Sequence, residues 1–165
     1  MEHMPGLVRN PVRLALAIAV SIAAGIPGSL VTNTGPGTWY ETLVKPDFFP
    51  PPFVFAPVWT VLYILMGIAL YRVWMEGTDK PAVRGALALF AAQLILNMLW
   101  SLIFFGLQNP ALALAEILLL LLVLIATTVR FSAVRRDAAW LLVPYILWVC
   151  FAAVLNASIM LQNPI

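Results

Sequence analysis

KPDFFPPPFVFAPVWTVLY, the stretch from Lys45 to Tyr63, begins as a proline-rich connector and ends as an apolar helix. The three consecutive prolines at 50–52 cannot lie inside a helix, because each lacks an N–H donor and clashes with the preceding turn. The helix is therefore predicted to begin near Phe53. Trp59 and Tyr63 then lie four residues apart on one helical face. This arrangement predicts the rim and wall of a pocket.

The composition of the chain is that of an integral membrane protein. Hydrophobic residues make up 63% of the 165 residues and charged residues 10%, whereas soluble proteins have roughly 45–50% and about 25%. The net charge of +2 comes from few, scattered charges, which argues against a nucleic-acid partner. The lone histidine, His3, has no Cys, Asp or second His near it, so no metal site is predicted.

Five segments are long and apolar enough to cross a bilayer, which takes about 20 residues as a helix. They are continuous apolar runs, whereas β-barrel strands would alternate apolar and polar residues. We therefore predict an all-α integral membrane protein, a bundle of five transmembrane helices in a single domain, 1–165. The expected spans are 12–31, 53–74, 83–105, 111–129 and 138–161, and residues 32–52 form a long loop, here called the cover loop.

The connectors refine this picture. In the cover loop, TWYETL is expected to form a short helix capped by Thr38, with Glu41 three residues later completing a capping box. Residues 106–110 are too few for anything but an antiparallel hairpin between the third and fourth spans. Of the nine Lys and Arg residues, all but Lys45 fall on one side of a five-span topology. The positive-inside rule then places the N-terminus in the cytoplasm and the cover loop on the opposite side.

Polar and aromatic residues inside the spans form stripes at three- and four-residue steps, and such residues usually face a bundle interior. Three stripes of aromatic and amide side chains on three helices are expected to converge on one largely apolar cavity. The stripes are Trp59 and Tyr63 in the second span, Gln93, Asn97 and Trp100 in the third, and Tyr145, Trp148, Ala152 and Asn156 in the fifth.

Structural roles compete with this interpretation. Asn97 and Asn156 are also suited to hydrogen bonds that hold helices together. Trp74 and Trp140 lie near span ends, where tryptophans form interfacial belts. Glu116, the only acidic residue deep in a span, is expected to make a structural hydrogen bond, and Cys150 is expected to be a small buried hydrophobe. Small residues at four-residue steps suit either intrachain packing or a homodimer interface.

The sequence contains no nucleophile–base constellation, carboxylate pair or phosphate-binding glycine loop, so no catalytic residues are assigned. If the protein is an enzyme, its chemistry has to use a reactive ligand beside tryptophans, for which Trp59 and Trp148 are the candidates.

Four segments carry a family resemblance: WYETLVKP from Trp39, PPPFVFAPVWTVLY from Pro50, QLILNMLWSLIFFG from Gln93 and PYILWVCFAAVLN from Pro144. Together they resemble the translocator protein family, also called the tryptophan-rich sensory protein or peripheral benzodiazepine receptor (TspO/MBR) family. The resemblance implies a five-helix bundle, often a homodimer, with a cavity closed by the first long loop. It implies binding of porphyrins such as protoporphyrin IX and haem, with no cofactor required. For animal members it also implies binding of cholesterol and benzodiazepine-type drugs.

The resemblance also implies roles for individual residues. Trp59 matches the second-span tryptophan that lines the family's cavity, and Tyr63 matches its neighbour one turn on. Asn97 and Trp100 match cavity residues of the third span. Trp39 falls on the loop tryptophan that covers the pocket.

In the fifth span, Trp148 matches a tryptophan implicated, with the second-span one, in porphyrin breakdown by some bacterial members. Ala152 falls where the family has a small residue that affects ligand and sterol binding. Phe48 and Phe53 stand where many members have tryptophan, so indole donors are lost from the expected aromatic wall. The chain also lacks the Tyr and Arg of the animal cholesterol motif, which makes cholesterol a less expected ligand and points to a bacterial cell membrane.

The leading hypothesis is a membrane receptor or carrier that binds tetrapyrroles, with a transport or sensory role. Its ligand would stack on Trp59, Trp100 and Trp148, with Asn97 and Trp39 fixing the polar edge. The alternatives are an enzyme that degrades porphyrins with light or oxygen, and a regulatory partner of other membrane proteins.

Overall fold

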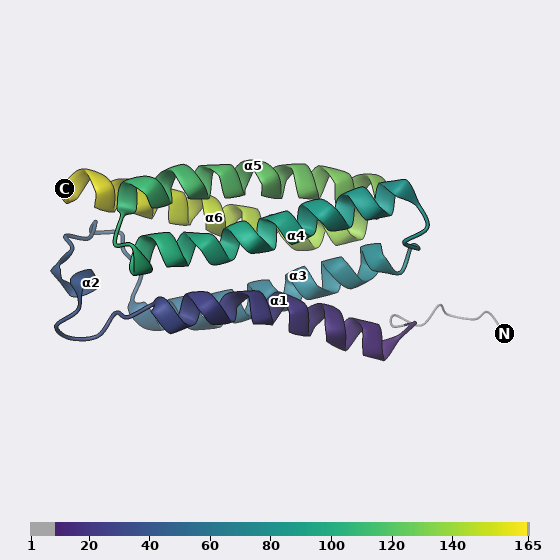
Figure 1. Cartoon of the computed structure of the whole chain (residues 1–165), viewed down its shortest axis with the longest axis horizontal. Coiled ribbons are helices and arrows are strands. Elements are labelled where there is room, and N and C mark those ends of the chain that lie inside the picture. The colour runs from purple at the N-terminus through teal and green to yellow at the C-terminus, as the bar shows by residue number, and fades with distance from the viewer. Residues whose placement is uncertain (1–8, 165) are drawn as a thin grey trace.

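A computed structural model describes residues 9–164, which leaves His3 outside the described residues. Within this range every regular element is helical, and five helices are long and apolar enough to span a membrane, as predicted. Figure 1 shows them side by side in one elongated bundle. Their bounds, with those of the short elements, are α1 (Pro11–Val31), α2 (Trp39–Thr42), η1 (Pro52–Val54), α3 (Phe55–Trp74), α4 (Pro81–Ser101), η2 (Leu102–Gly106), α5 (Pro110–Val134) and α6 (Arg136–Gln162).

Proline and asparagine set the starts of several helices. A 3₁₀ turn begins at Pro52 and leads directly into α3, so Pro57 falls in the first turn of α3, where its missing N–H costs nothing. Asn10 and Asn109 cap α1 and α5, each side chain accepting a hydrogen bond from the backbone N–H three residues later. These signals fix where each chain segment enters the bundle.

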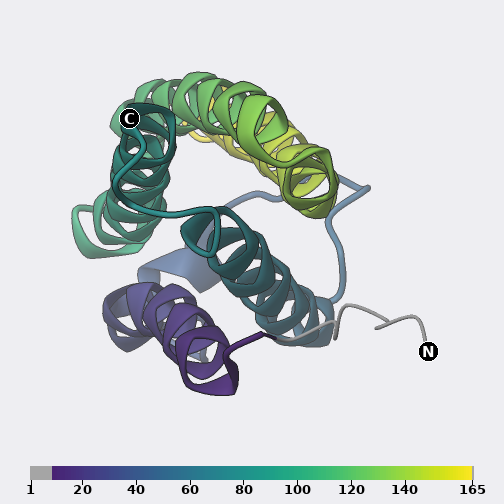
Figure 2. The ribbon, with the colours of Figure 1, turned by 90° about the vertical axis from the view of Figure 1, so that its right-hand side faces the viewer.

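In the bundle α5 packs against both α4 and α6, α1 packs against α3 and α4, and α3 also packs against α6. The cover loop and the C-terminus lie at one end of the bundle, and α1 begins at the other (Figure 1). Figure 2 views the bundle along its length. At Gly67 the two helices α1 and α3 touch, since a Cβ there would lie 2.5 Å from the Cα of Ile18.

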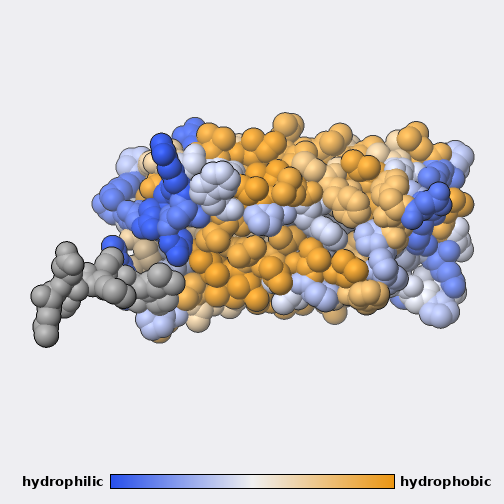
Figure 3. Space-filling view, turned by 180° about the vertical axis from the view of Figure 1, so that it is seen from behind, coloured by the Kyte–Doolittle hydropathy of each residue, from blue (hydrophilic) through white to orange (hydrophobic). Residues whose placement is uncertain are grey.

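Apolar side chains cover the middle of the bundle, and polar residues gather at its two ends (Figure 3). Leu30 is 80% exposed and Trp140 72% exposed, as expected for side chains that face lipid. Cys150 is also exposed, so the expectation that it is buried is wrong. In a bilayer, small apolar residues are as stable facing lipid as facing protein.

An ion-pair cluster ties together the ends of α3 and α6 away from the cover loop. Arg135 donates to Asp137 at 2.7 Å and to Glu76 at 2.9 Å, and Arg72 also pairs with Asp137. Hydrogen bonds to these two carboxylates raise the pKa of the Arg135 guanidinium. The positive-inside rule assigns the basic residues at this end of the bundle to the cytoplasm. This orientation remains a prediction.

The cover loop differs in two ways from expectation. Thr38 precedes α2 but does not cap it, because its hydroxyl donates to the Gly35 carbonyl at 2.7 Å. The Glu41 carboxylate instead accepts a hydrogen bond from the Gly37 N–H at 2.6 Å. The expected capping box is therefore replaced by two hydrogen bonds that fold the loop back on its own turn.

Candidate ligand-binding cavity

A cavity of about 520 Å³ lies among the halves of the helices nearest the cover loop. Its volume falls within the range of small-molecule sites, roughly 300–1,000 Å³. Residues of α1, α3, α4, α5 and α6 form its walls, and Tyr40 and Phe49 of the cover loop lie over it. Ile26 of α1 and Thr60 of α3 line the cavity but are exposed, so the cavity opens on the side of these two helices.

One wall is a cluster of aromatic rings from α3 and α6. Trp59 and Tyr63 stack with their ring centres 5.6 Å apart, which is the contact that their four-residue spacing predicts. The ring of Trp148 meets Trp59 at 6.5 Å and 90°, and Phe55 at 5.8 Å. All of these side chains are partly exposed in the cavity, so their faces and edges are available to a flat apolar ligand.

A second wall is built around Trp100 of α4. Its ring stacks on Phe104 at 5.2 Å, and its indole N–H donates to Asn156 Oδ1 at 3.0 Å. The Asn156 amide in turn donates to the backbone carbonyl of Pro110 at 2.7 Å. Asn156 thus links three helices and holds the Trp100 ring in one orientation.

Asn97 is the centre of the polar network behind the aromatic wall. Its Oδ1 accepts a hydrogen bond from the Tyr63 hydroxyl at 2.7 Å, and its Nδ2 donates to the fully buried Tyr145 hydroxyl at 2.9 Å. The amide is therefore already paired on both sides. Asn97 and Asn156 both line the cavity, and their hydrogen bonds match the structural role that competes with ligand contact.

The structure brings together most of the residues that the sequence selected. Three selected residues do not line the cavity. The Trp39 ring packs edge-on against Phe104 at 5.7 Å, and Gln93 and Tyr145 of the expected stripes are fully buried. The selected residues that line the cavity are Trp59, Tyr63, Asn97, Trp100, Trp148, Ala152 and Asn156.

The aromatic residues expected to replace family tryptophans do not form the wall. Phe48 is 52% exposed and Phe53 is 77% exposed, and neither lines the cavity. Phe49 and Phe55 line it instead, and they pack against each other at 5.6 Å. Sequence reasoning missed both, because the aromatic residues on either side of the three prolines give no signal as to which of them point inward.

Tyr40 lines the cavity at its cover-loop end, and Lys45, which is not a lining residue, packs against Tyr40. The Lys45 ammonium lies 4.3 Å from the centre of the Tyr40 ring and donates to the Tyr40 carbonyl at 2.7 Å. Burial raises the pKa of the Tyr40 phenol to about 12. The Lys45 ammonium, which also donates to the Leu43 carbonyl at 3.3 Å, thus places a positive charge beside a residue of the cavity wall.

Glu116 of α5 is only 8% exposed. Neither of its carboxylate oxygens has a hydrogen-bond partner within residues 9–164, so the structural hydrogen bond expected for it is not formed. In the same part of the chain, no group of His, Cys, Asp and Glu is arranged to hold a metal ion.

Comparisons with known proteins agree with this architecture. The family model described as TspO/MBR family matches residues 17–161. The chain is 45% identical over 151 residues to the Tryptophan-rich protein TspO of Chlorobaculum tepidum, covering 92% of this chain and 96% of that protein. It is 39% identical to the Tryptophan-rich sensory protein of Cereibacter sphaeroides, covering 90% of this chain and 92% of that protein.

An animal relative matches at a similar level. The chain is 38% identical to the Translocator protein of Bos taurus over 143 residues, covering 86% of this chain and 84% of that protein. The match to bacterial relatives agrees with the bacterial location that the sequence predicts. The five apolar helices and these matches together show that the chain is a multi-pass membrane protein that belongs to the TspO/MBR family.

Proposed function

We propose that the protein is a membrane receptor or carrier that binds a tetrapyrrole, protoporphyrin IX or haem, in the cavity between its helices. The observation that carries the proposal is the convergence of Trp59, Trp100 and Trp148 from three helices on one cavity. Indole faces give a flat conjugated ligand a large contact area, and edge-to-face contacts add to it. The names of the relatives, translocator and sensory protein, fit a transport or sensory role for such a site.

The charges of the cavity suggest how the ligand is oriented. Both tetrapyrroles carry carboxylates on one edge and are apolar elsewhere. Tyr40 lines the cavity at its cover-loop end with the Lys45 ammonium against its ring, whereas the Asn97 amide is already paired with two tyrosines. The carboxylate edge is therefore assigned to the cover loop, and the macrocycle to the Trp59–Trp148 wall. Cholesterol, which has no anionic group, would leave this end of the site unused.

A fluorescence titration tests the proposal. Protoporphyrin IX added to the purified protein in vesicles should quench tryptophan emission saturably. The double variant Trp59→Phe, Trp148→Phe should bind more weakly, because phenylalanine offers a smaller aromatic face. At about 0.5–1.5 kcal/mol for each ring, affinity falls roughly fivefold to 150-fold. The matched control is Trp74→Phe, Trp140→Phe, whose rings lie outside the cavity. Equal affinity of both double variants would reject the site.

A second candidate function is light- or oxygen-dependent degradation of the bound porphyrin. The perpendicular contact of Trp59 with Trp148 on the cavity wall favours it, because tryptophans can donate electrons to an excited ligand. Illumination with protoporphyrin IX in air should then give a new absorbing product that is lost in Trp59→Phe. The same spectrum from porphyrin without protein would reject it.

A further inference from the structure

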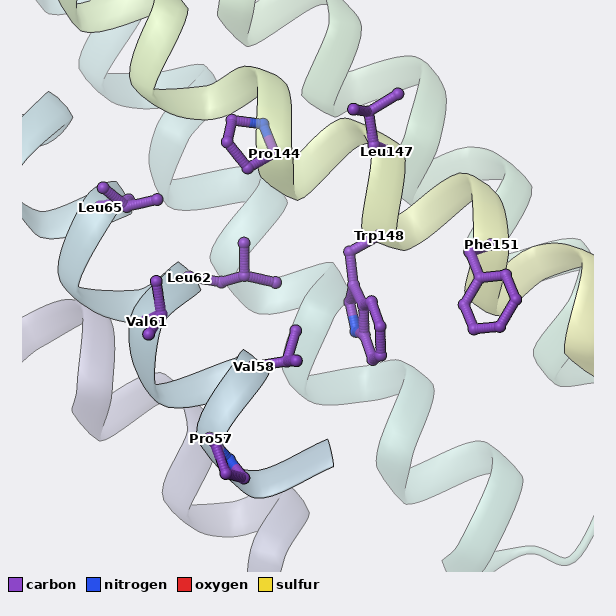
Figure 4. Close-up of a pocket in the computed structure, with 9 residues that line it drawn as sticks. All are labelled: Pro57, Val58, Val61, Leu62, Leu65, Pro144, Leu147, Trp148 and Phe151. Carbon is purple, nitrogen blue, oxygen red and sulfur yellow. The ribbon is translucent and has the colours of Figure 1, made fainter. Parts of the chain in front are cut away.

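A second hollow lies on the outer, lipid-facing side of the bundle, between α3 and α6. It is a groove of about 660 Å³, open along its length, and only apolar residues line it. In Figure 4 Val58 and Leu62 of α3 project toward α6, and Trp148 reaches from α6 toward α3; Val61, Pro144 and Leu147 also line the groove. Val61 is 55% exposed and Leu147 65% exposed, so the groove is accessible from the bilayer.

Trp148 belongs to the walls of both hollows. On one side its ring meets Trp59 and Phe55 of the cavity wall. On the other side it lies beside Phe151, 5.6 Å away, in the groove. A single indole ring therefore separates the interior cavity from the membrane at this position.

The helix that carries this ring has a weak point one turn earlier. Pro144 lies inside α6 and lines the groove. A proline within a helix removes one backbone hydrogen bond and allows the helix to bend. Trp148 is therefore attached to a segment of α6 that can adjust to whatever fills the groove.

We propose that an acyl chain of a bilayer lipid binds in the groove between α3 and α6 and packs on the outer face of Trp148. An acyl chain is the occupant because the lining offers no polar group to a headgroup, a sterol hydroxyl or a porphyrin carboxylate. The depth agrees, since Trp148 lies about 18 Å along α6 from Arg136, near the middle of a ~30 Å hydrocarbon core. Through this shared ring, the lipid affects the shape of the ligand cavity.

The first experiment tests the docking itself and needs no ligand. The full chain is reconstituted in vesicles of plain lipid and of lipid brominated near the middle of its acyl chains, which quenches tryptophans in contact with them. The emission of Trp148, taken as wild type minus Trp148→Phe, should lose at least half of its intensity in brominated lipid. Equal emission of Trp148 in the two lipids would overturn the proposal.

Filling the groove gives the matched test. The double variant Val61→Phe, Leu147→Phe places two rings in the groove and should abolish most of the Trp148 quenching. The control Ile64→Phe, Val154→Phe adds the same rings to exposed positions of the same helices outside the groove and should leave it unchanged. Equal quenching in the two variants would overturn the assignment. If added sterol alone restored Trp148 emission, the occupant would be a sterol, and the assignment of an acyl chain to the groove would be wrong.

The second experiment tests the coupling and rests on the proposed function. The dissociation constant for protoporphyrin IX should differ roughly fivefold between vesicles of straight-chain lipid and of methyl-branched lipid, whose broader chains pack differently against the groove. The variant Val61→Phe, Leu147→Phe should bind protoporphyrin IX with the same affinity in both lipids, whereas the control Ile64→Phe, Val154→Phe should keep the difference between them. A wild-type affinity independent of the lipid would overturn the coupling. Absence of any protoporphyrin binding would reject the proposed function, and the quenching result would still decide the docking.

Discussion

Replacing Asn97 with leucine should destabilise the protein more than any other single change in the cavity wall. Leucine has the same branched shape and number of heavy atoms as asparagine, so the position stays filled while the two hydrogen bonds of the amide are lost. The Tyr63 hydroxyl faces the cavity, where it can be solvated, but Tyr145 is fully buried. The Tyr145 hydroxyl would then lose the partner that it has at 2.9 Å.

The magnitude follows from the number of groups affected. A hydrogen bond between membrane helices contributes about 0.6 kcal/mol on average and up to about 1.7 kcal/mol. A buried hydroxyl left without a partner costs about 1–3 kcal/mol. With two bonds lost and one hydroxyl stranded, the free energy of unfolding should fall by about 2–4 kcal/mol. The unfolding equilibrium constant then rises roughly 30-fold to 700-fold.

The assay is equilibrium unfolding in mixed micelles of a mild detergent and increasing SDS, followed by tryptophan fluorescence. The decisive comparison uses Tyr145→Phe in two backgrounds. In the wild type it should destabilise, because it removes the acceptor of the Asn97 amide. In Asn97→Leu it should stabilise, because it removes a stranded hydroxyl. Tyr63→Phe serves as the control for loss of one bond.

Two results would refute this reasoning. One is a loss below about 0.5 kcal/mol for Asn97→Leu, less than an average interhelical hydrogen bond. The other is a Tyr145→Phe change of the same sign and size in both backgrounds, which would mean that the two residues do not interact.

Three further outcomes are expected. Gly67→Ala should destabilise the protein by about 3 kcal/mol in the same unfolding assay, because the added methyl group forces α1 away from α3. The control Gly85→Ala, at a glycine with open space around it, should change stability by less than about 1 kcal/mol. Equal effects would contradict the close helix contact. Burial raises the pKa of Tyr40 to about 12, so the stability that its neutral phenol contributes is complete below pH 10 and is lost as the pH rises toward 12. The difference in tyrosinate absorbance between wild type and Tyr40→Phe should show one group titrating near pH 12. A midpoint near 10 would be inconsistent with burial. Lys45→Gln should weaken protoporphyrin IX binding roughly fivefold at low salt and less at high salt. The control is Lys80→Gln at the other end of the bundle. An equal effect of the two changes would show that Lys45 does not contribute to the site.

Much of the fold follows from sequence because it depends on chain-length and backbone constraints. A helix must span the membrane, so long apolar runs mark five helices. Three prolines cannot enter a helix, so the boundary before α3 lies near its predicted place. The stack of Trp59 on Tyr63 follows from four-residue spacing alone. The same periodicity brings Trp100 and Trp148 to a common cavity.

The remaining errors arise where the sequence has no such constraint. In the cover loop no helical period decides which of Trp39 and Tyr40 points inward, and the backbone of the loop turns Tyr40 to the cavity and Trp39 to Phe104. On α6, Cys150 is exposed. Apolar residues cover all sides of a membrane helix, so hydrophobicity does not separate its lipid face from its core.

Polar residues in the spans show a third limit. The sequence selected Asn97 and Asn156 correctly as residues at the cavity. It could not tell that both amides are occupied by other helices, because both roles place an amide toward the bundle interior. Only the three-dimensional contacts move the polar edge of the proposed ligand from Asn97 to Tyr40 and Lys45.

The most direct test of the central claim is an experimental structure of the protein with bound protoporphyrin IX. The account predicts the macrocycle in the cavity against Trp59 and Trp148, with its carboxylates toward Lys45 of the cover loop. A macrocycle bound in the outer groove between α3 and α6, or on the surface with the cavity empty, would contradict it.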